Sequence, residues 1–254
     1  LSAAAFLGVT GAIALYGYDG FLYSVGFLIA LLVALVLVAE PLRNTGKFTM
    51  ADVLSFRLKQ RPVRTAAAMS TLMISLFYLI AQMAGAGGLV ALLLGISGKA
   101  AQAGVVAIVG VLMIIYVLVG GMKGTTYVQM IKAVLLVGGS IIIALLTFWF
   151  IKGGFNAVLE TAIANHPKGE AIVNPGLKYG KNELTKLDFI SLGAALVFGT
   201  AGLPHVLMRF YTVPTAREAR RSVTWTIGIV ALFFLLTVVM GYGAAALVGP
   251  DDIQ

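Results

Sequence analysis

Hydrophobic residues are grouped along the chain into seven runs, which short polar or glycine-rich stretches separate. A membrane-spanning helix needs about 20 consecutive, mainly apolar residues, and every run except the first reaches this length. The first run has the length of a half-helix. The pattern predicts an all-α integral membrane protein, with residues 1–254 forming one transmembrane domain. The runs cover residues 1–16, 21–42, 65–94, 100–119, 125–151, 187–211 and 224–248.

The two ends of the chain favour an internal piece of a longer protein. The chain begins at Leu1 inside an apolar run and without a methionine, and it ends at Gln254 just after another apolar run. We therefore expect the transmembrane domain to lack helices at both ends.

Composition excludes several classes of protein. The chain is 60% hydrophobic and 11% charged, whereas soluble domains carry about 25% charged residues. The absence of cysteine excludes disulfides and cysteine-ligated metal sites. The net charge of +8 belongs to loops beside a membrane and does not indicate a nucleic-acid partner. With no nucleotide motif, paired membrane carboxylates or nucleophile–base pair, the sequence predicts neither an enzyme nor an organic cofactor.

The distribution of lysine and arginine predicts the orientation in the membrane. Cytoplasmic loops are enriched in these residues, and most of those in short loops lie in residues 43–64, 120–124 and 212–222. These three loops are expected on the cytoplasmic side of the cell inner (plasma) membrane. Alternating crossings place Asp19 and the long polar stretch 152–186 on the opposite side.

Two local features give further predictions. Thr49 is a plausible N-cap for a short interfacial helix within the basic loop 43–64. Glycines in the middle runs, such as Gly87 and Gly138, are expected to be sites where helices pack closely.

The sixth run contains helix-breaking residues at membrane depth. Pro204 lacks a backbone donor, and Gly199 and Gly202 make unwinding easy. Freed backbone groups are tolerated in a membrane only where they are buried in protein or line a wet cavity, so a broken helix indicates a binding site; a simple proline kink is the alternative. The first and sixth runs are five crossings apart and oppositely oriented, which favours an inverted repeat with a broken helix leading each half.

Several motifs resemble those of the sodium:solute symporter family, and most closely its cation/acetate symporter (acetate permease) branch. The resemblance covers nearly the whole chain in the right order. The motifs are SAAAFLG at 2–8, GYDG at 17–20, TMADVLSFRLK at 49–59, YLIAQMAGAG at 78–87, GGM at 120–122, GTAGLPH at 199–205 and REAR at 217–220.

This resemblance implies a leucine-transporter-type fold, a five-plus-five inverted repeat, of which the chain would cover core helices one (in part) to seven. It implies a sodium ion between helices one and eight, where Leu1 would match a backbone-carbonyl ligand and the helix-eight ligands would follow residue 254. Many family members have an acidic residue where this chain has Gln129. A second sodium site that uses such a carboxylate is therefore not expected.

A small monocarboxylate needs a positive potential and hydrogen-bond donors. An unwound backbone at 199–202 and a half-helix N-terminus would supply both. Hydroxyl groups from Ser2 and Thr200 would add donors, although either hydroxyl can instead bond to its own helix. The expected substrate site comprises Ser2, Ala5, Gly199, Thr200, Ala201 and Gly202.

Five further polar residues are candidates for the transport pathway. His205 would carry a proton or pair with an anion, unless it satisfies a neighbouring carbonyl. Tyr78 and Gln82 share a helical face and either line the path or join helices. Gln129 and Lys132 share another face, where the lysine either acts in the pathway or extends to the lipid headgroups.

Together these features predict a secondary active transporter that works by alternating access in the lipid bilayer. It would couple the symport of acetate, or another short monocarboxylate, to Na+ or to H+. One alternative is a symporter of the same family for an amino acid, a vitamin or a sugar; Ala5, Gly199 and Ala201 argue weakly against a sugar. Another is a transporter-like sensor module that feeds a signalling domain.

Overall fold

The computed structural model describes residues 2, 4–45, 49–96 and 98–248, and every regular element among them is a helix. The all-α membrane architecture is therefore confirmed. In chain order the elements are η1 (Ala4–Gly8), α1 (Val9–Tyr16), α2 (Tyr18–Val33), η2 (Ala34–Val38), α3 (Ala39–Asn44), α4 (Met50–Ser55), α5 (Gln60–Leu93), α6 (Lys99–Phe150), α7 (Gly154–Asn165), η3 (Gly169–Val173), α8 (Glu183–Ala201), α9 (Pro204–Leu207), η4 (Met208–Tyr211) and α10 (Ala216–Leu247).

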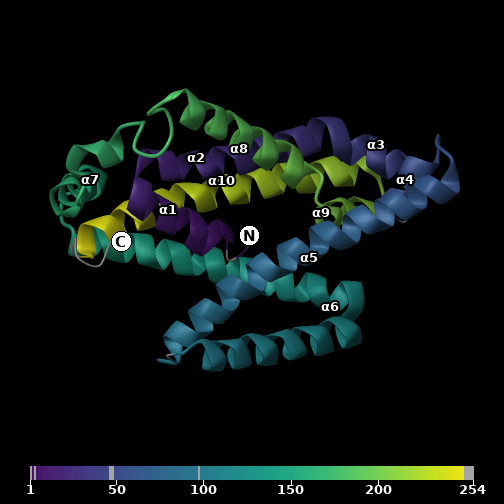
Figure 1. Cartoon of the computed structure of the whole chain (residues 1–254), viewed down its shortest axis with the longest axis horizontal. Coiled ribbons are helices and arrows are strands. Elements are labelled where there is room, and N and C mark those ends of the chain that lie inside the picture. The colour runs from purple at the N-terminus through teal and green to yellow at the C-terminus, as the bar shows by residue number, and fades with distance from the viewer. Residues whose placement is uncertain (1, 3, 46–48, 97, 249–254) are drawn as a thin grey trace.

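Within the described residues, five helical segments are long and apolar enough to cross a membrane. They are Tyr18–Asn44, Gln60–Leu93, Lys99–Phe150, Glu183–Tyr211 and Ala216–Leu247. The segment Lys99–Phe150 has 52 residues and would be about 78 Å long if straight. It reverses direction near Gly121, whose φ of 52° and ψ of −148° are not helical (Figure 1). The predicted turn at 120–124 is thus present, and α6 supplies two crossings.

A second sharp turn separates α1 from α2. Gly17 has a φ of 53°, which is readily available only to glycine. A Cβ at this position would overlap the backbone carbonyl of Ile172. The turn is shorter than the predicted stretch 17–20, because α2 begins at Tyr18 immediately after this glycine.

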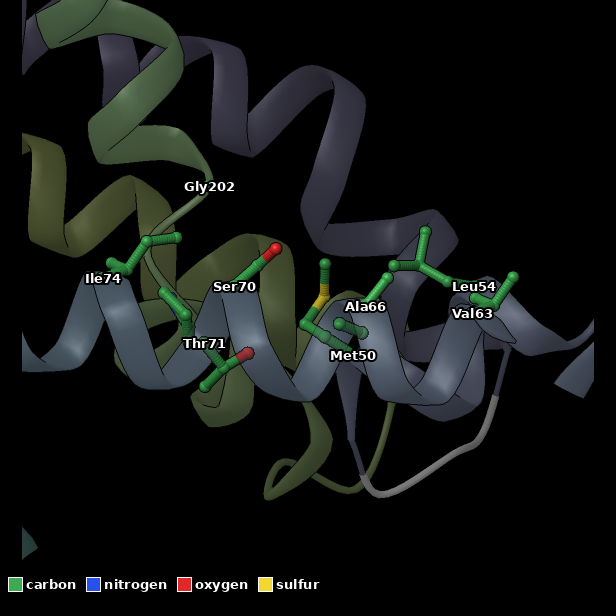
Figure 2. Close-up of a pocket in the computed structure, with 10 residues that line it drawn as sticks. Met50, Leu54, Val63, Ala66, Ser70, Thr71, Ile74 and Gly202 are labelled. Atoms are coloured by element: carbon green, nitrogen blue, oxygen red, sulfur yellow. The ribbon is translucent and has the colours of Figure 1, made fainter. Parts of the chain in front are cut away.

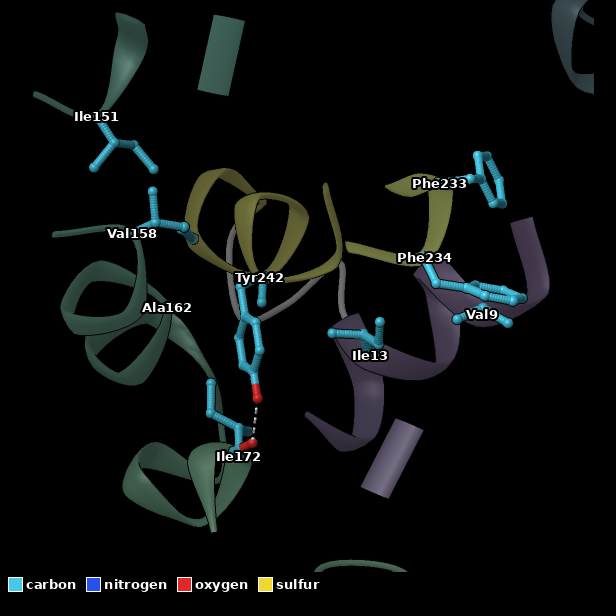
Figure 3. Packing of buried hydrophobic residues seen from close by; sticks show 11 residues of the cluster. Val9, Ile13, Ile151, Val158, Ala162, Ile172, Phe233, Phe234 and Tyr242 are labelled. Carbon is cyan, nitrogen blue, oxygen red and sulfur yellow. Dashed lines mark hydrogen bonds between the residues drawn. The ribbon is translucent and has the colours of Figure 1, made fainter. Parts of the chain in front are cut away.

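The buried core lies where α1, α2, α7 and α10 pack together (Figure 1). Phe233 and Phe234 of α10 are almost fully buried in it, together with Val9 and Ile13 of α1. The rings of Phe27 and Phe234 stack with their centroids 6.0 Å apart. Figure 3 shows this cluster extending to Tyr242, whose hydroxyl donates to the carbonyl of Ile172 at 3.0 Å.

By contrast, α5 and the first arm of α6 pack against each other and expose most of their apolar side chains. Leu118 and Val119, for example, are 77% and 85% exposed. A soluble protein rarely exposes apolar surface on this scale. A bilayer explains it, because its hydrocarbon core favours such side chains.

The polar stretch 152–186 holds more structure than its sequence indicated. The helix α7 lies within it and buries Val158 and Ala162 against α10. These two residues are four positions apart and share one helical face. The 3-10 helix η3 buries Ile172 in the same cluster.

Candidate functional site

The sixth apolar run is interrupted between α8 and α9. Gly202 and Leu203 connect the two helices, and Leu203 has an extended conformation with φ −61° and ψ 122°. Pro204 occupies the first position of α9. Because a proline ring disfavours the helical conformation of the preceding residue, Pro204 determines where the break falls.

The predicted unwinding at 199–202 is therefore displaced toward the C-terminus. Gly199, Thr200 and Ala201 remain helical. The backbone N–H of Gly202 donates to the carbonyls of Phe198 and Gly199, at 3.1 and 3.2 Å. These glycines permit unwinding, but nothing in the local geometry requires it. The free backbone donors expected at 199–202 are accordingly not seen at Gly202.

Two adjoining cavities, of about 300 and 440 Å³, lie between the break, α4 and α5. Their walls are mainly apolar, with hydroxyl groups from Ser70 and Thr71 of α5. Figure 2 shows Gly202 above these α5 side chains. Both cavities are lined by Met50, Ala67, Thr71 and Pro204. The break thus opens onto a space of a size common in small-molecule sites.

Helix α4 forms one wall of these cavities, and a polar cluster fixes its start. The Thr49 hydroxyl accepts the N–H of Asp52 and donates to its carboxylate, as expected for the predicted N-cap. Arg64 of α5 pairs with the same carboxylate. The Thr49 hydroxyl and the Arg64 charge together hold the pKa of Asp52 below its usual value. The Asp52 carboxylate therefore joins α4 to α5 through its ion pair with Arg64.

Tyr78 and His205 meet beside the first cavity. Their ring centroids are 4.7 Å apart, with an angle of 41° between the rings. Ser70, Ile74 and Tyr78 are spaced four residues apart along α5, so they follow one helical face, and His205 directly follows Pro204. The structure thus brings together two of the predicted pathway residues, one from α5 and one from the helix that follows the break.

The remaining predicted substrate residues are more dispersed. Ala201 is buried against Ala30 of α2 and Ala34 of η2. The Ser2 hydroxyl accepts the N–H of Ala5 at 3.2 Å. Ala5 packs at the edge of the main cluster. Thr200 is half-buried and Gly199 is exposed. Of the six residues, Gly202 is the one that lines the first cavity.

The other pathway candidates lie away from these cavities. Gln82 is half-buried on α5, while Gln129 and Lys132 are exposed on the second arm of α6. None of the three lines either cavity. The predicted sodium ligand Leu1 lies outside the described residues.

A polar network that the sequence did not reveal attaches residues 176–179 to α2. The Asp19 carboxylate is 1% exposed and accepts the backbone N–H groups of Gly176, Lys178 and Tyr179, at 3.2, 2.6 and 3.0 Å. A buried carboxylate must be paired or hydrogen-bonded, and these three donors satisfy it. The sequence signal was limited to one acidic residue beside a glycine turn.

The side chain of Lys178 strengthens this attachment. Its ammonium lies 4.8 Å from the ring centroid of Tyr16 and 5.3 Å from those of Tyr23 and Tyr179. It also donates to the Tyr23 hydroxyl at 2.9 Å. Burial opposes the charged form, but the hydroxyl groups of Tyr23 and Tyr179 together outweigh it and raise the pKa of Lys178. We name Asp19, Lys178 and these tyrosines the outer clamp.

A second attachment lies at the other end of the bundle. Arg43 of α3 donates from Nε to the carbonyl of Val213 at 2.6 Å and from Nη2 to that of Pro214 at 2.7 Å. We name these contacts the inner clamp. Arg209 donates to the Thr126 hydroxyl at 2.6 Å, just after the turn in α6. The loops that begin at residues 43, 120 and 212 therefore lie at one end, as their shared sidedness requires.

Comparison with known proteins identifies the family of this sequence. The sequence profile of the sodium:solute symporter family matches residues 1–252. The chain belongs to the sodium:solute symporter family. The family membership predicted from the motifs is therefore confirmed.

Two relatives of this sodium:solute symporter chain carry curated names. The monocarboxylic acid transporter of Corynebacterium glutamicum is 64% identical over 263 residues, covering 100% of this chain and 48% of the relative. An uncharacterized symporter of Bacillus subtilis, YwcA, is 52% identical over 253 residues, with the same coverage of each chain. The chain thus spans about half the length of these relatives. No solved structure matches it, so the inverted repeat remains a prediction of the family resemblance.

Proposed function

We propose that the protein containing this chain is a secondary active symporter for acetate or another short monocarboxylate. It would act in the plasma membrane of a bacterium, with the loops 43–64, 120–124 and 212–222 facing the cytoplasm. Sodium is the proposed coupling ion, since the chain belongs to the sodium:solute symporter family. Proton coupling is the alternative retained from the sequence.

The observation that carries this proposal is the break at Gly202 and Leu203, which opens onto a cavity within a membrane-spanning segment. Secondary transporters commonly place their substrate at such discontinuous helices. The 64% identity to a protein named monocarboxylic acid transporter favours a monocarboxylate over an amino acid, a vitamin or a sugar. Alternating access would expose the break to each side of the membrane in turn.

Uptake of radiolabelled acetate into proteoliposomes that contain the full-length protein tests the function. We expect saturable uptake that an inward sodium gradient drives. Vesicles without protein give the rate at which undissociated acetic acid crosses the bilayer. Uptake that is independent of sodium and driven by a proton gradient would support the transport function but replace Na+ by H+ as the coupling ion. An absence of uptake under both gradients would reject acetate as a substrate.

A variant next to the break tests the site. Thr200→Val removes a hydroxyl near the break while preserving the side-chain shape, and we expect it to reduce sodium-driven acetate uptake. Thr226→Val is a matched control, because the exposed Thr226 hydroxyl bonds to its own helix at the carbonyl of Ser222. Equal uptake by both variants would remove Thr200 from the proposed site.

A further inference from the structure

The ring contact between Tyr78 and His205 joins α5 to the first turn of α9, directly after the break. His205 remains exposed in spite of this contact, so a small solute in the neighbouring space can reach it. Among the described residues, neither the imidazole nor the Tyr78 hydroxyl forms a hydrogen bond within the chain. Both side chains therefore have polar atoms available to a ligand.

The charges around this pair favour an anion. Arg209 lies one turn beyond His205, and its guanidinium bonds to Thr126. The Arg209 charge adds a positive potential at His205, which favours an anion there and opposes a protonated imidazole as long as no anion is bound. Helix α5, which carries Tyr78, contains no aspartate or glutamate, and neither do residues 198–211. The acid across the cavity, Asp52, is paired with Arg64.

A protonated imidazole in a membrane needs a counter-ion, and the chain offers none at this position among its described residues. The apolar cavity beside the pair, lined by Ile74, Gly202 and Pro204, suits the alkyl part of a small acid. An imidazolium N–H and a phenol O–H are two donors that a carboxylate can accept together, and such charge-assisted bonds are strong.

We propose that His205 and Tyr78 bind the carboxylate of the transported acid, with His205 in its protonated form. This inference rests on the proposed function, and it names residues for the substrate's charged end beyond the break itself. The backbone break then serves to bring His205 to the face of α5 that carries Tyr78.

The test is the pH dependence of KM for acetate uptake by the full-length transporter in proteoliposomes. The wild-type KM, measured between about pH 5 and pH 8, should rise with pH as the His205 imidazole loses its proton. His205→Gln should raise KM at the lower pH about tenfold or more, as expected for the loss of a charged hydrogen bond. Its KM should also become independent of pH.

Two tyrosine variants complete the design. Tyr78→Phe removes one hydroxyl donor, and we expect a rise in KM of about threefold or more with the pH dependence retained. Tyr116→Phe makes the same change on the first arm of α6, away from the break, and should keep the wild-type KM. Should His205→Gln fail to assemble in the membrane, the KM of Tyr78→Phe decides.

Several outcomes would overturn the proposal. They are a wild-type KM in Tyr78→Phe, a pH-dependent KM that persists in His205→Gln, and a loss of maximal rate in His205→Gln at unchanged KM. If the wild type itself takes up no monocarboxylate, the proposed function fails first. That result is distinguishable, because it does not depend on either variant.

Discussion

The buried carboxylate of Asp19 accepts the backbone N–H of Lys178 at 2.6 Å, across 159 positions of sequence. This bond, with those from Gly176 and Tyr179, attaches the loop after η3 to the first turn of α2. The loop therefore covers the corner between α1 and α2 as an ordered part of the bundle. Because the Asp19 carboxylate accepts all three of these backbone N–H groups, substitution of this side chain tests the attachment.

Asp19→Asn should destabilise the protein. An amide has a single acceptor oxygen, and its NH₂ group would face donors, so at least one backbone N–H would lose its partner in a buried place. The expected loss is about 1–3 kcal/mol, seen as a lower thermal transition in detergent. Asp188→Asn, on the exposed surface of α8, should stay within about 0.5 kcal/mol of the wild type. Equal transitions for both variants would show that the outer clamp contributes little.

Acid should loosen the same region through His166. This side chain is 6% exposed, and its Nδ1 accepts the N–H of Lys168 at 3.0 Å. Burial lowers the pKa of His166, so below the usual value of about 6.5 the unfolded chain binds protons that the folded chain does not. Stability should then fall as the pH decreases through this range.

Thermal transitions of the full-length protein in detergent at about pH 7.5 and pH 5.5 test this expectation. His166→Gln should flatten the dependence on pH, because glutamine does not titrate. A wild-type transition that is unchanged between the two values would contradict the assignment.

Around the inner clamp, two polar contacts should contribute differently to the stability of the protein. Arg43 is half-buried and donates to two carbonyls, so Arg43→Gln should destabilise by about 1–2 kcal/mol. The pair of Arg220 and Glu40 is exposed on both sides, so Glu40→Gln should cost about 0–1 kcal/mol. Limited proteolysis in the loop after η4, followed for both variants, measures the difference. Faster cleavage in Glu40→Gln than in Arg43→Gln would reverse this order.

Replacing the proline should close the break. With Pro204→Ala, residue 204 regains a backbone donor and Leu203 can become helical, so α8 is expected to continue into α9. Uptake by the full-length protein should fall about tenfold or more, since the opening to the cavity would be altered. Pro62→Ala is the control, because Pro62 lies in the exposed first turn of α5. Wild-type uptake by Pro204→Ala would show that transport does not need the break.

Much of the fold followed from the sequence because hydrophobic runs report directly on membrane crossings. The Thr49 cap and the reversal within α6 were also predicted, since both are set by residues adjacent in sequence. The ends of helices were less well predicted. The last span begins at Ala216 rather than at 224, because Thr215 caps it by accepting the N–H of Glu218.

Contacts between distant segments could not be predicted in this way. Gly87 packs against Val106 as expected, but a Cβ added at Gly138 would meet no neighbouring helix within 4 Å. The two glycines look alike in sequence and differ only in what lies opposite. The same holds for Asp19, whose donors come from a loop that the sequence left without structure. At the site, proline chemistry indicated a break, while the contact of Tyr78 with His205 required the fold.

The two clamps have a mechanical consequence for the segment between them. The continuous helical segment of α2, η2 and α3 is attached near its start by Asp19 and near its end by Arg43. The neighbouring segment, α8 with α9, is interrupted at Gly202 and Leu203. A helical segment bends more easily at a break in its backbone hydrogen bonding than along a continuous stretch. If one end of these two segments moved relative to the other, the bending would therefore occur mainly at Gly202 and Leu203, beside the cavity.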